Sequence, residues 1–207
     1  MASTAQTARK PSRIQTRNRK RILDAALEVF SSHGYRGATL DQIAEESGLS
    51  KPNILYYFGG KEDIHVTLLN QLMESWLEPL EQLDPKGEPM EEILGYVRRK
   101  VEMTREFPRE SRLFANEILQ GAPRMAPHLE SGLKPLFDEK CAVIRGWSDT
   151  GQIASVDPRH LMFSIWATTQ HYADFDAQVR VLMAGESGVL DGAGTHVETM
   201  FRKLLTP

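Results

Sequence analysis

Residues 39–61 have the sequence TLDQIAEESGLSKPNILYYFGGK, and this stretch decides the fold of the first part of the chain. Thr39 followed by Gln42 forms a T-x-x-Q capping box, which predicts that a helix starts here. Gly48 favours the left-handed conformation that ends such a helix, and Ser50 can cap a second one. Two short helices joined by so tight a turn indicate a helix-turn-helix.

The second short helix is a candidate for the major groove of DNA. In a helix-turn-helix, the first turn of this helix meets base edges, and nearby residues lie beside the sugar-phosphate strand. The candidate DNA contacts are Arg17, Thr39, Ser50, Lys51, Pro52, Asn53, Tyr56, Tyr57 and Lys61. The alternative is a helical hairpin that is capped only for stability, since capping boxes occur in proteins of every class.

The residues around this motif resemble the DNA-binding domain of the TetR family of repressors from Arg17 to Leu69. Two positions depart from the family pattern. Leu55 stands where the family usually has Tyr, and Gly60 replaces the usual Ser before Lys61. The matching stretches are FSSHGYRGAT (residues 30–39), IAEESGLSK (43–51) and YYFGGKEDI (56–64).

Charge is distributed unevenly along the chain. The net charge is −3, but the first 23 residues carry seven basic groups and no acid, which leaves −10 on the rest. Such polarity suits a molecule that presents one end to DNA. We expect residues 1–16 to form a basic flexible arm that DNA orders. Alternatively, these residues are a solvated charged tail or a transit peptide.

Helical periodicity continues to the end of the chain, and no strand-like alternation is present. We therefore expect an all-α fold, in which a helix-turn-helix domain (17–63) precedes a larger helical domain for ligand binding and dimerisation (64–207). The first helix should close at Gly34, and Pro79 should end or kink the fourth. Later helices are expected over about 90–107, 109–119, 129–149, 157–175 and 195–205, with a loop at 84–89 and a Gly-rich segment at 185–194.

Several classes of protein are disfavoured by what the sequence lacks. It has no apolar run that could span a bilayer and no secretory signal, which favours a cytoplasmic protein without a membrane partner. The six histidines fall on separate segments and there is no H-E-x-x-H, so we predict no metal site and no cofactor. No catalytic motif indicates an enzyme. Cys141 lies in an apolar helical pattern, which favours a buried thiol over a reactive one.

One predicted helix carries a stripe that could hold a small molecule. Met162, Trp166, Gln170 and Ala173 recur at spacings of four, four and three, so they share a helix face. An amide among apolar side chains needs a hydrogen-bond partner, and a planar heterocycle could supply one while it stacks on the indole. The alternatives are that Trp166 is core and Gln170 bonds a neighbouring helix, or that the stripe is a subunit interface.

Three segments narrow the resemblance to the pyrimidine-utilisation repressors of the TetR family. They are QLMESWLEPL (71–80), SRLFANEILQGAP (111–123) and VDPRHLMFSIWATTQHYADF (156–175). This resemblance implies that uracil or thymine is the effector, and that Trp76, Trp166 and Gln170 contact it. Phe114, Asn116, Tyr172 and Asp174 are nearby candidates.

The function that follows is a ligand-responsive repressor. We expect a homodimer, joined through the last two long helices of each chain, to bind a palindromic operator and to release it when the pyrimidine binds. One rival keeps the repressor but changes the effector to another small amide or aromatic compound. A rival of another class is an enzyme or scaffold that acts on nucleobases.

Overall fold

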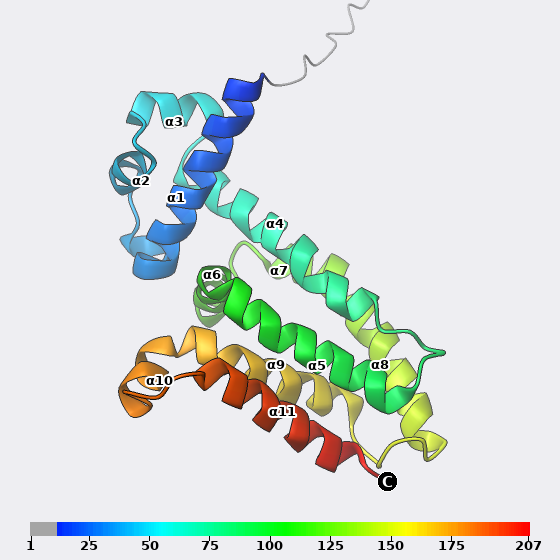
Figure 1. The fold of residues 1–207 in the computed structure, drawn as a ribbon. Coiled ribbons are helices and arrows are strands. Elements are labelled where there is room, and N and C mark those ends of the chain that lie inside the picture. The colour runs from blue at the N-terminus through cyan, green and yellow to red at the C-terminus, as the bar shows by residue number, and fades with distance from the viewer. Residues whose placement is uncertain (1–11) are drawn as a thin grey trace, which may run out of the picture. The chain divides into compact units, whose positions relative to one another are not determined.

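The structure, a computed structural model, describes residues 12–207 and contains no strand among them. The chain separates into a first compact unit that ends at Leu68 and a second that runs from Leu69 to Pro207. The separation falls inside helix α4 (Lys61–Glu81), beyond the expected domain junction at residues 63 and 64 (Figure 1). Each unit is built from helices around its own core.

The first helix, α1 (Arg13–Gly37), begins earlier than expected because Ser12 caps it. The Ser12 side chain accepts a hydrogen bond from the Gln15 backbone, and the Gln15 side chain accepts one from the Ser12 backbone. Residues 13–16 are therefore helical, and the rest of the expected arm, residues 1–11, lies outside the described residues. Gly34, with φ of 65°, breaks the helical geometry where closure was predicted.

Helices α2 (Leu40–Ser47) and α3 (Lys51–Tyr57) confirm the predicted caps. Thr39 and Gln42 form the reciprocal capping box, Gly48 is left-handed with φ of 62°, and Ser50 caps α3. Arg21 of α1 adds a contact that was not predicted: its guanidinium donates to the Ser47 carbonyl oxygen at 2.6 Å. Since the last carbonyls of a helix lack partners within it, this bond stabilises the end of α2.

The core of the first unit contains one or more fully buried apolar side chains from each helix. The residues with 0% exposure are Ile22, Ala26, Phe30, Ile43, Ile54 and Ile64. Because side chains from α1, α2, α3 and α4 meet there, the three helices of the motif are held in one arrangement.

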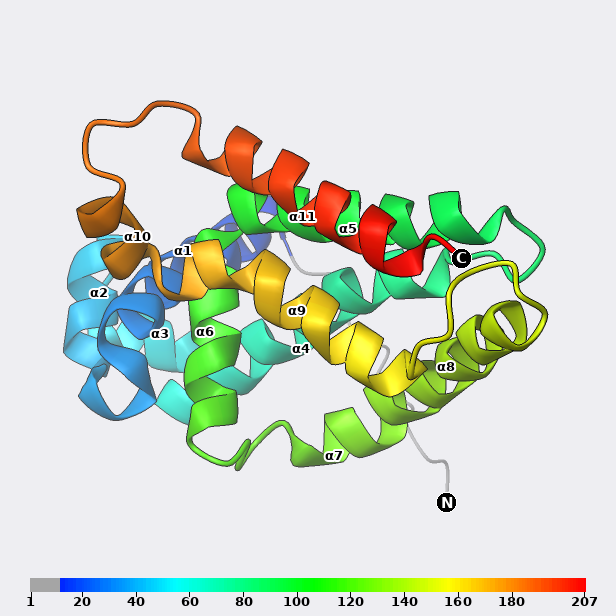
Figure 2. The same cartoon turned by 90° about the horizontal axis from the view of Figure 1, so that it is seen from below.

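The second unit contains the rest of α4 and a series of helices, of which α9 packs against the largest number of others. Helix α5 packs against both α9 and α11, while α9 also packs on α6 and α8 (Figure 2). The buried cluster between them includes Ile93, Val97, Ile165 and Phe201. The helices are α5 (Pro89–Glu106), α6 (Pro108–Leu119), α7 (Ala126–His128), the π-helical η1 (Leu129–Leu133), α8 (Lys134–Asp149), α9 (Pro158–Asp174), α10 (Asp176–Leu182) and α11 (Val189–Leu205).

Helix α4 ends at Glu81, two residues after Pro79, where the sequence predicted an end or a kink. Two other predicted boundaries in this unit were wrong. The expected helix over 129–149 begins at Ala126 and includes the π-helical turn. The last helix begins at Val189 instead of Thr195, and α10 was not predicted. Glycines in the first turns of α11 are tolerated because Ala193 beside them is buried and packing outweighs their low propensity.

Cys141 is buried in α8, as its helical pattern predicted. Burial raises the pKa of its thiol, which lowers the population of the reactive thiolate. Within residues 12–207, no helix has the length and apolar character needed to cross a bilayer.

Candidate DNA-binding surface and ligand cavity

The start of α3 presents the side chains that were predicted to meet bases. Lys51 and Pro52 are exposed and Asn53 is half-buried. The Lys51 ammonium lies 3.0 Å from a carboxylate oxygen of Asp41, and both side chains are exposed. Exposed pairs of this kind contribute only about 0.2–1 kcal/mol, so a phosphate or base edge can replace this partner.

The end of α3 is hydrogen-bonded to α1 through the two tyrosines of α3. The side-chain amide of Gln15 donates to the Tyr56 hydroxyl at 3.3 Å, and that of Asn18 donates to the Tyr57 hydroxyl at 3.1 Å. Arg19 donates to the Tyr57 carbonyl oxygen at 3.1 Å. Tyr56 nevertheless remains 70% exposed. The bonds to α1 fix the direction in which α3 presents both rings.

Lys61 has a local role that was not predicted. Its ammonium donates to the carbonyl oxygens of Tyr35 and Ala38, each at 2.8 Å, and lies 4.4 Å from the centroid of the Tyr35 ring. Two of its three N–H groups are thus used inside the first unit, which leaves one for a phosphate. Arg17, by contrast, is exposed and forms no hydrogen bond or ion pair with any other described residue.

Thr39 and Ser50 are committed to capping. The Thr39 hydroxyl accepts from the Gln42 backbone at 3.2 Å and donates to the Gln42 side chain at 2.9 Å. The Ser50 hydroxyl accepts from the Asn53 backbone at 3.4 Å. Contacts of either hydroxyl with DNA remain a prediction.

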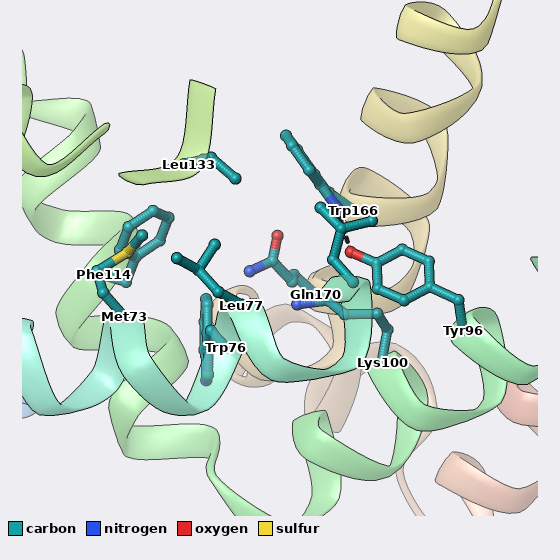
Figure 3. Close-up of a pocket in the computed structure, with 10 residues that line it drawn as sticks. Met73, Trp76, Leu77, Tyr96, Lys100, Phe114, Leu133, Trp166 and Gln170 are labelled. Atoms are coloured by element: carbon teal, nitrogen blue, oxygen red, sulfur yellow. Dashed lines mark hydrogen bonds between the residues drawn. The ribbon is translucent and has the colours of Figure 1, made fainter. Parts of the chain in front are cut away.

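In the second unit, the three predicted ligand residues do come together. Trp76, Trp166 and Gln170 line one cavity of about 80 Å³ (Figure 3). Among the nearby candidates Phe114 lines it, whereas Asn116, Tyr172 and Asp174 are not among its lining residues. The other lining residues are Met73, Leu77 and Leu80 from α4, Tyr96 and Lys100 from α5, and Leu133 from η1.

Each indole in the cavity is held differently. Trp166 donates its N–H to the Tyr96 hydroxyl at 2.8 Å, and burial raises the pKa of Tyr96, so the phenol stays neutral. The Trp76 ring lies at a tilt against Phe114, with centroids 5.2 Å apart. The Trp76 N–H is buried and has no acceptor among the described residues. A residue of the cavity wall therefore has a buried polar group that no described residue satisfies.

Besides the Trp76 N–H, two further polar groups of the cavity wall have no hydrogen-bond partner among the described residues: the Gln170 amide and the Lys100 ammonium. Lys100 was missed by the sequence analysis. It is only 4% exposed, and burial lowers its pKa to about 8, against the opposing charge of Asp174. The site combines flat apolar walls with an amide and a cation to which no described residue gives a hydrogen-bond acceptor or donor.

A second cavity, of about 210 Å³, lies where the end of α4 meets α5. None of the predicted ligand residues lines it. Its charged side chains already have partners: Glu91 bonds Arg98 at 3.1 Å, and Arg99 bonds Glu106 at 2.8 Å. Because its charged groups already have partners, this cavity gives no indication of a ligand comparable to that from Gln170.

Metal binding has no candidate centre in the part of the chain that the structure describes. No group of three or more His, Cys, Asp or Glu side chains there could hold an ion.

A capped helix-turn-helix unit followed by a helical unit with an internal cavity is the architecture of a helix-turn-helix transcription regulator. The chain belongs to the TetR family of these regulators. Residues 22–66 match the family described as "Bacterial regulatory proteins, tetR family", and residues 69–206 match the "YcdC-like protein, C-terminal region". Members of the family bind operator DNA and small-molecule effectors, typically as dimers.

Individual relatives agree with this assignment. The chain is 47% identical over 176 residues to the "HTH-type transcriptional regulator RutR" of Escherichia coli (strain K12), covering 85% of this chain and 83% of the relative. The fold is similar to that of KstR2 of Mycobacterium tuberculosis, with a TM-score of 0.76 at 17% identity over 91% and 95% of the two chains. It is also similar to AibR in complex with isovaleryl coenzyme A and operator DNA, with a TM-score of 0.70 at 18% identity over 88% and 97%.

Proposed function

We propose that this transcription regulator is a repressor whose second unit binds a free pyrimidine base, uracil or thymine, and that binding releases a palindromic operator. Its targets would be genes of pyrimidine catabolism and nitrogen supply, as the resemblance to RutR implies. The observation that carries the proposal is the Gln170 amide, which has no hydrogen-bond partner among residues 12–207 and lines a cavity walled by Trp76 and Trp166.

Uracil satisfies this site chemically. The Gln170 amide is half-buried, and a cyclic imide offers the C=O and N–H that complement it. The indole faces suit a flat, uncharged ring. A volume of about 80 Å³ is several times the roughly 10–15 Å³ that one water needs. This room favours a single ring over an extended acyl chain.

DNA binding is proposed to use two copies of the chain. Dimerisation through α9 and α11 would bury apolar side chains such as Phe163 and Leu204, which are exposed in the single chain. A two-fold axis would then place the two α3 helices about 34–36 Å apart on successive turns of DNA. Lys51, Pro52 and Asn53 would meet base edges, while the other predicted residues would contact the sugar-phosphate strand.

Helix α4 is the proposed link between ligand and DNA. Its first residue, Lys61, is bonded to Tyr35 and Ala38, and later turns of the same helix bring Trp76 and Leu77 to the cavity. A ligand can shift the operator equilibrium only by its preference for the released state. Changing occupancy from 99% to 1% requires a preference of about 5.5 kcal/mol.

The test is calorimetric titration of the purified protein with uracil, repeated with Trp166→Ala and Gln170→Leu. Gln178→Leu is the matched control, because Gln178 is exposed on α10. We expect saturable binding in the wild type and the control and loss of binding in both cavity variants, which should still bind operator DNA.

Other outcomes separate the rivals. If uracil and thymine give no heat but another small amide or aromatic compound binds, the protein is still a regulator but has a different effector. Recovery of chemically altered uracil after incubation would favour an enzyme. Binding that survives both cavity substitutions would place the site elsewhere.

A further inference from the structure

Lys100 brings a cation into a cavity that is otherwise largely apolar. Its Nζ lies 4.5 Å from the centroid of the Trp76 ring. Figure 3 shows the side chain extending from α5 toward Trp76 and Gln170. The ammonium is therefore placed beside the same space as the amide that carries the proposed function.

One buried lysine of this unit is hydrogen-bonded, whereas the other has no acceptor within residues 12–207. Lys140 is 5% exposed, and its ammonium donates to the Leu83 carbonyl oxygen at 3.2 Å and lies 3.0 Å from a Glu139 carboxylate oxygen. Lys100 is equally buried, yet among the described residues it has only the face of Trp76 and the more distant charge of Asp174. A buried ammonium without hydrogen bonds raises the free energy of the folded protein, so a ligand that supplies an acceptor would be favoured here.

We propose that Lys100 is a second recognition residue, whose ammonium donates a hydrogen bond to a ring carbonyl oxygen of the ligand. This inference rests on the proposed function and deepens it. Gln170 would pair with one C=O and N–H edge of the ring, and Lys100 would bind the other carbonyl. The site would then select heterocycles that carry two carbonyl oxygens.

The selection follows from the direction of the hydrogen bonds. An ammonium can only donate, whereas the Gln170 amide can donate and accept. A dione such as uracil or thymine presents an acceptor to both groups. If a ring placed an amino group next to Lys100, two hydrogen-bond donors would face each other, and the buried ammonium would have no acceptor.

The experiment is a double-mutant cycle in which one change is made in the protein and the other in the ligand. Calorimetry would measure the affinity of the wild type and of Lys100→Met for uracil and for two analogues, each of which lacks one of the two carbonyl oxygens. Lys134→Met is the control: it removes the same charge from an exposed position of α8. The unfolding midpoint of Lys100→Met should not fall, because a buried lone charge is replaced by an apolar side chain of similar length.

We expect one analogue to bind the wild type and Lys134→Met roughly 10- to 150-fold more weakly than uracil, the range of a charged hydrogen bond. Lys100→Met should lose most of that ratio, since the missing carbonyl has no partner in the variant. If the wild type binds uracil but the ratios are unchanged in Lys100→Met, the inference is wrong and the proposed function stands. If the wild type binds no uracil, both are wrong.

Proton uptake gives a second readout. The titratable groups around this ammonium are Tyr96 on α5 and Asp174 on α9; the cavity residues from α4, α6 and η1 carry no charge. A carbonyl acceptor favours the charged ammonium, so binding should raise the pKa of Lys100 from about 8.

At pH 8, titrations in buffers of different ionisation enthalpy should then show uptake of up to about half a proton per site, and uracil affinity should fall as pH rises above 8. Below the pH at which the ring N–H itself ionises, Lys100→Met should show neither effect. Proton release in the wild type would overturn the inference, because it would mean that the ring binds as its anion.

Discussion

Replacing Tyr96 with Phe tests how the cavity wall is held. The change removes only the hydroxyl that accepts the Trp166 N–H at 2.8 Å. The indole N–H is then left without a partner in a half-buried place, which costs about 1–3 kcal/mol. With a urea m-value of about 2 kcal/mol/M, the unfolding midpoint should fall by about 0.5–1.5 M.

Tryptophan fluorescence is the appropriate probe, because Trp76, Trp147 and Trp166 all belong to the second unit. The protein concentration must be fixed, since association of chains would shift the midpoint. Tyr172→Phe is the matched control: its hydroxyl forms no hydrogen bond with any described residue, and the change should stay within about 0.5 kcal/mol. If Tyr96→Phe is as stable as this control, the bond between hydroxyl and indole does not stabilise the wall.

The first unit offers three further tests. Thr39→Ala removes the capping box with Gln42 and should lower stability by about 1 kcal/mol, measured by urea unfolding followed with circular dichroism; an unchanged midpoint would mean that the cap is dispensable. Asn53→Ala should abolish the preference for operator over random DNA in a competition binding assay without loss of helicity, and retained preference would exclude it as a base contact. Removing residues 1–11 leaves the Ser12 cap intact. It should reduce the slope of log binding constant against log salt concentration, for any DNA, by about 0.9 for each phosphate that the arm neutralises. An unchanged slope would mean that the arm does not contact phosphates.

The elements that could be predicted well are those whose signals are local. Thr39 and Gln42 cap the helix that they begin, and Gly48 adopts the left-handed conformation that only a few residue types tolerate. By contrast, α10 has only 7 residues, which is too short for the apolar periodicity by which a helix is usually found. The π-helical turn at 129–133 depends on packing between segments, which no local pattern encodes.

In the cavity, Trp166 and Gln170 were predicted, whereas Lys100 was missed although its own helical spacing carried a local signal. The two predicted residues share one helix, and their spacing places them side by side. Lys100 follows Val97 by three positions and precedes Thr104 by four, and both of these residues are buried. Helical spacing therefore put a charge on the buried face of α5, a placement that costs several kcal/mol unless something binds the charge. A lysine at such a position is a stronger indication of a ligand than an aromatic residue, because an aromatic side chain is stable in a core without one.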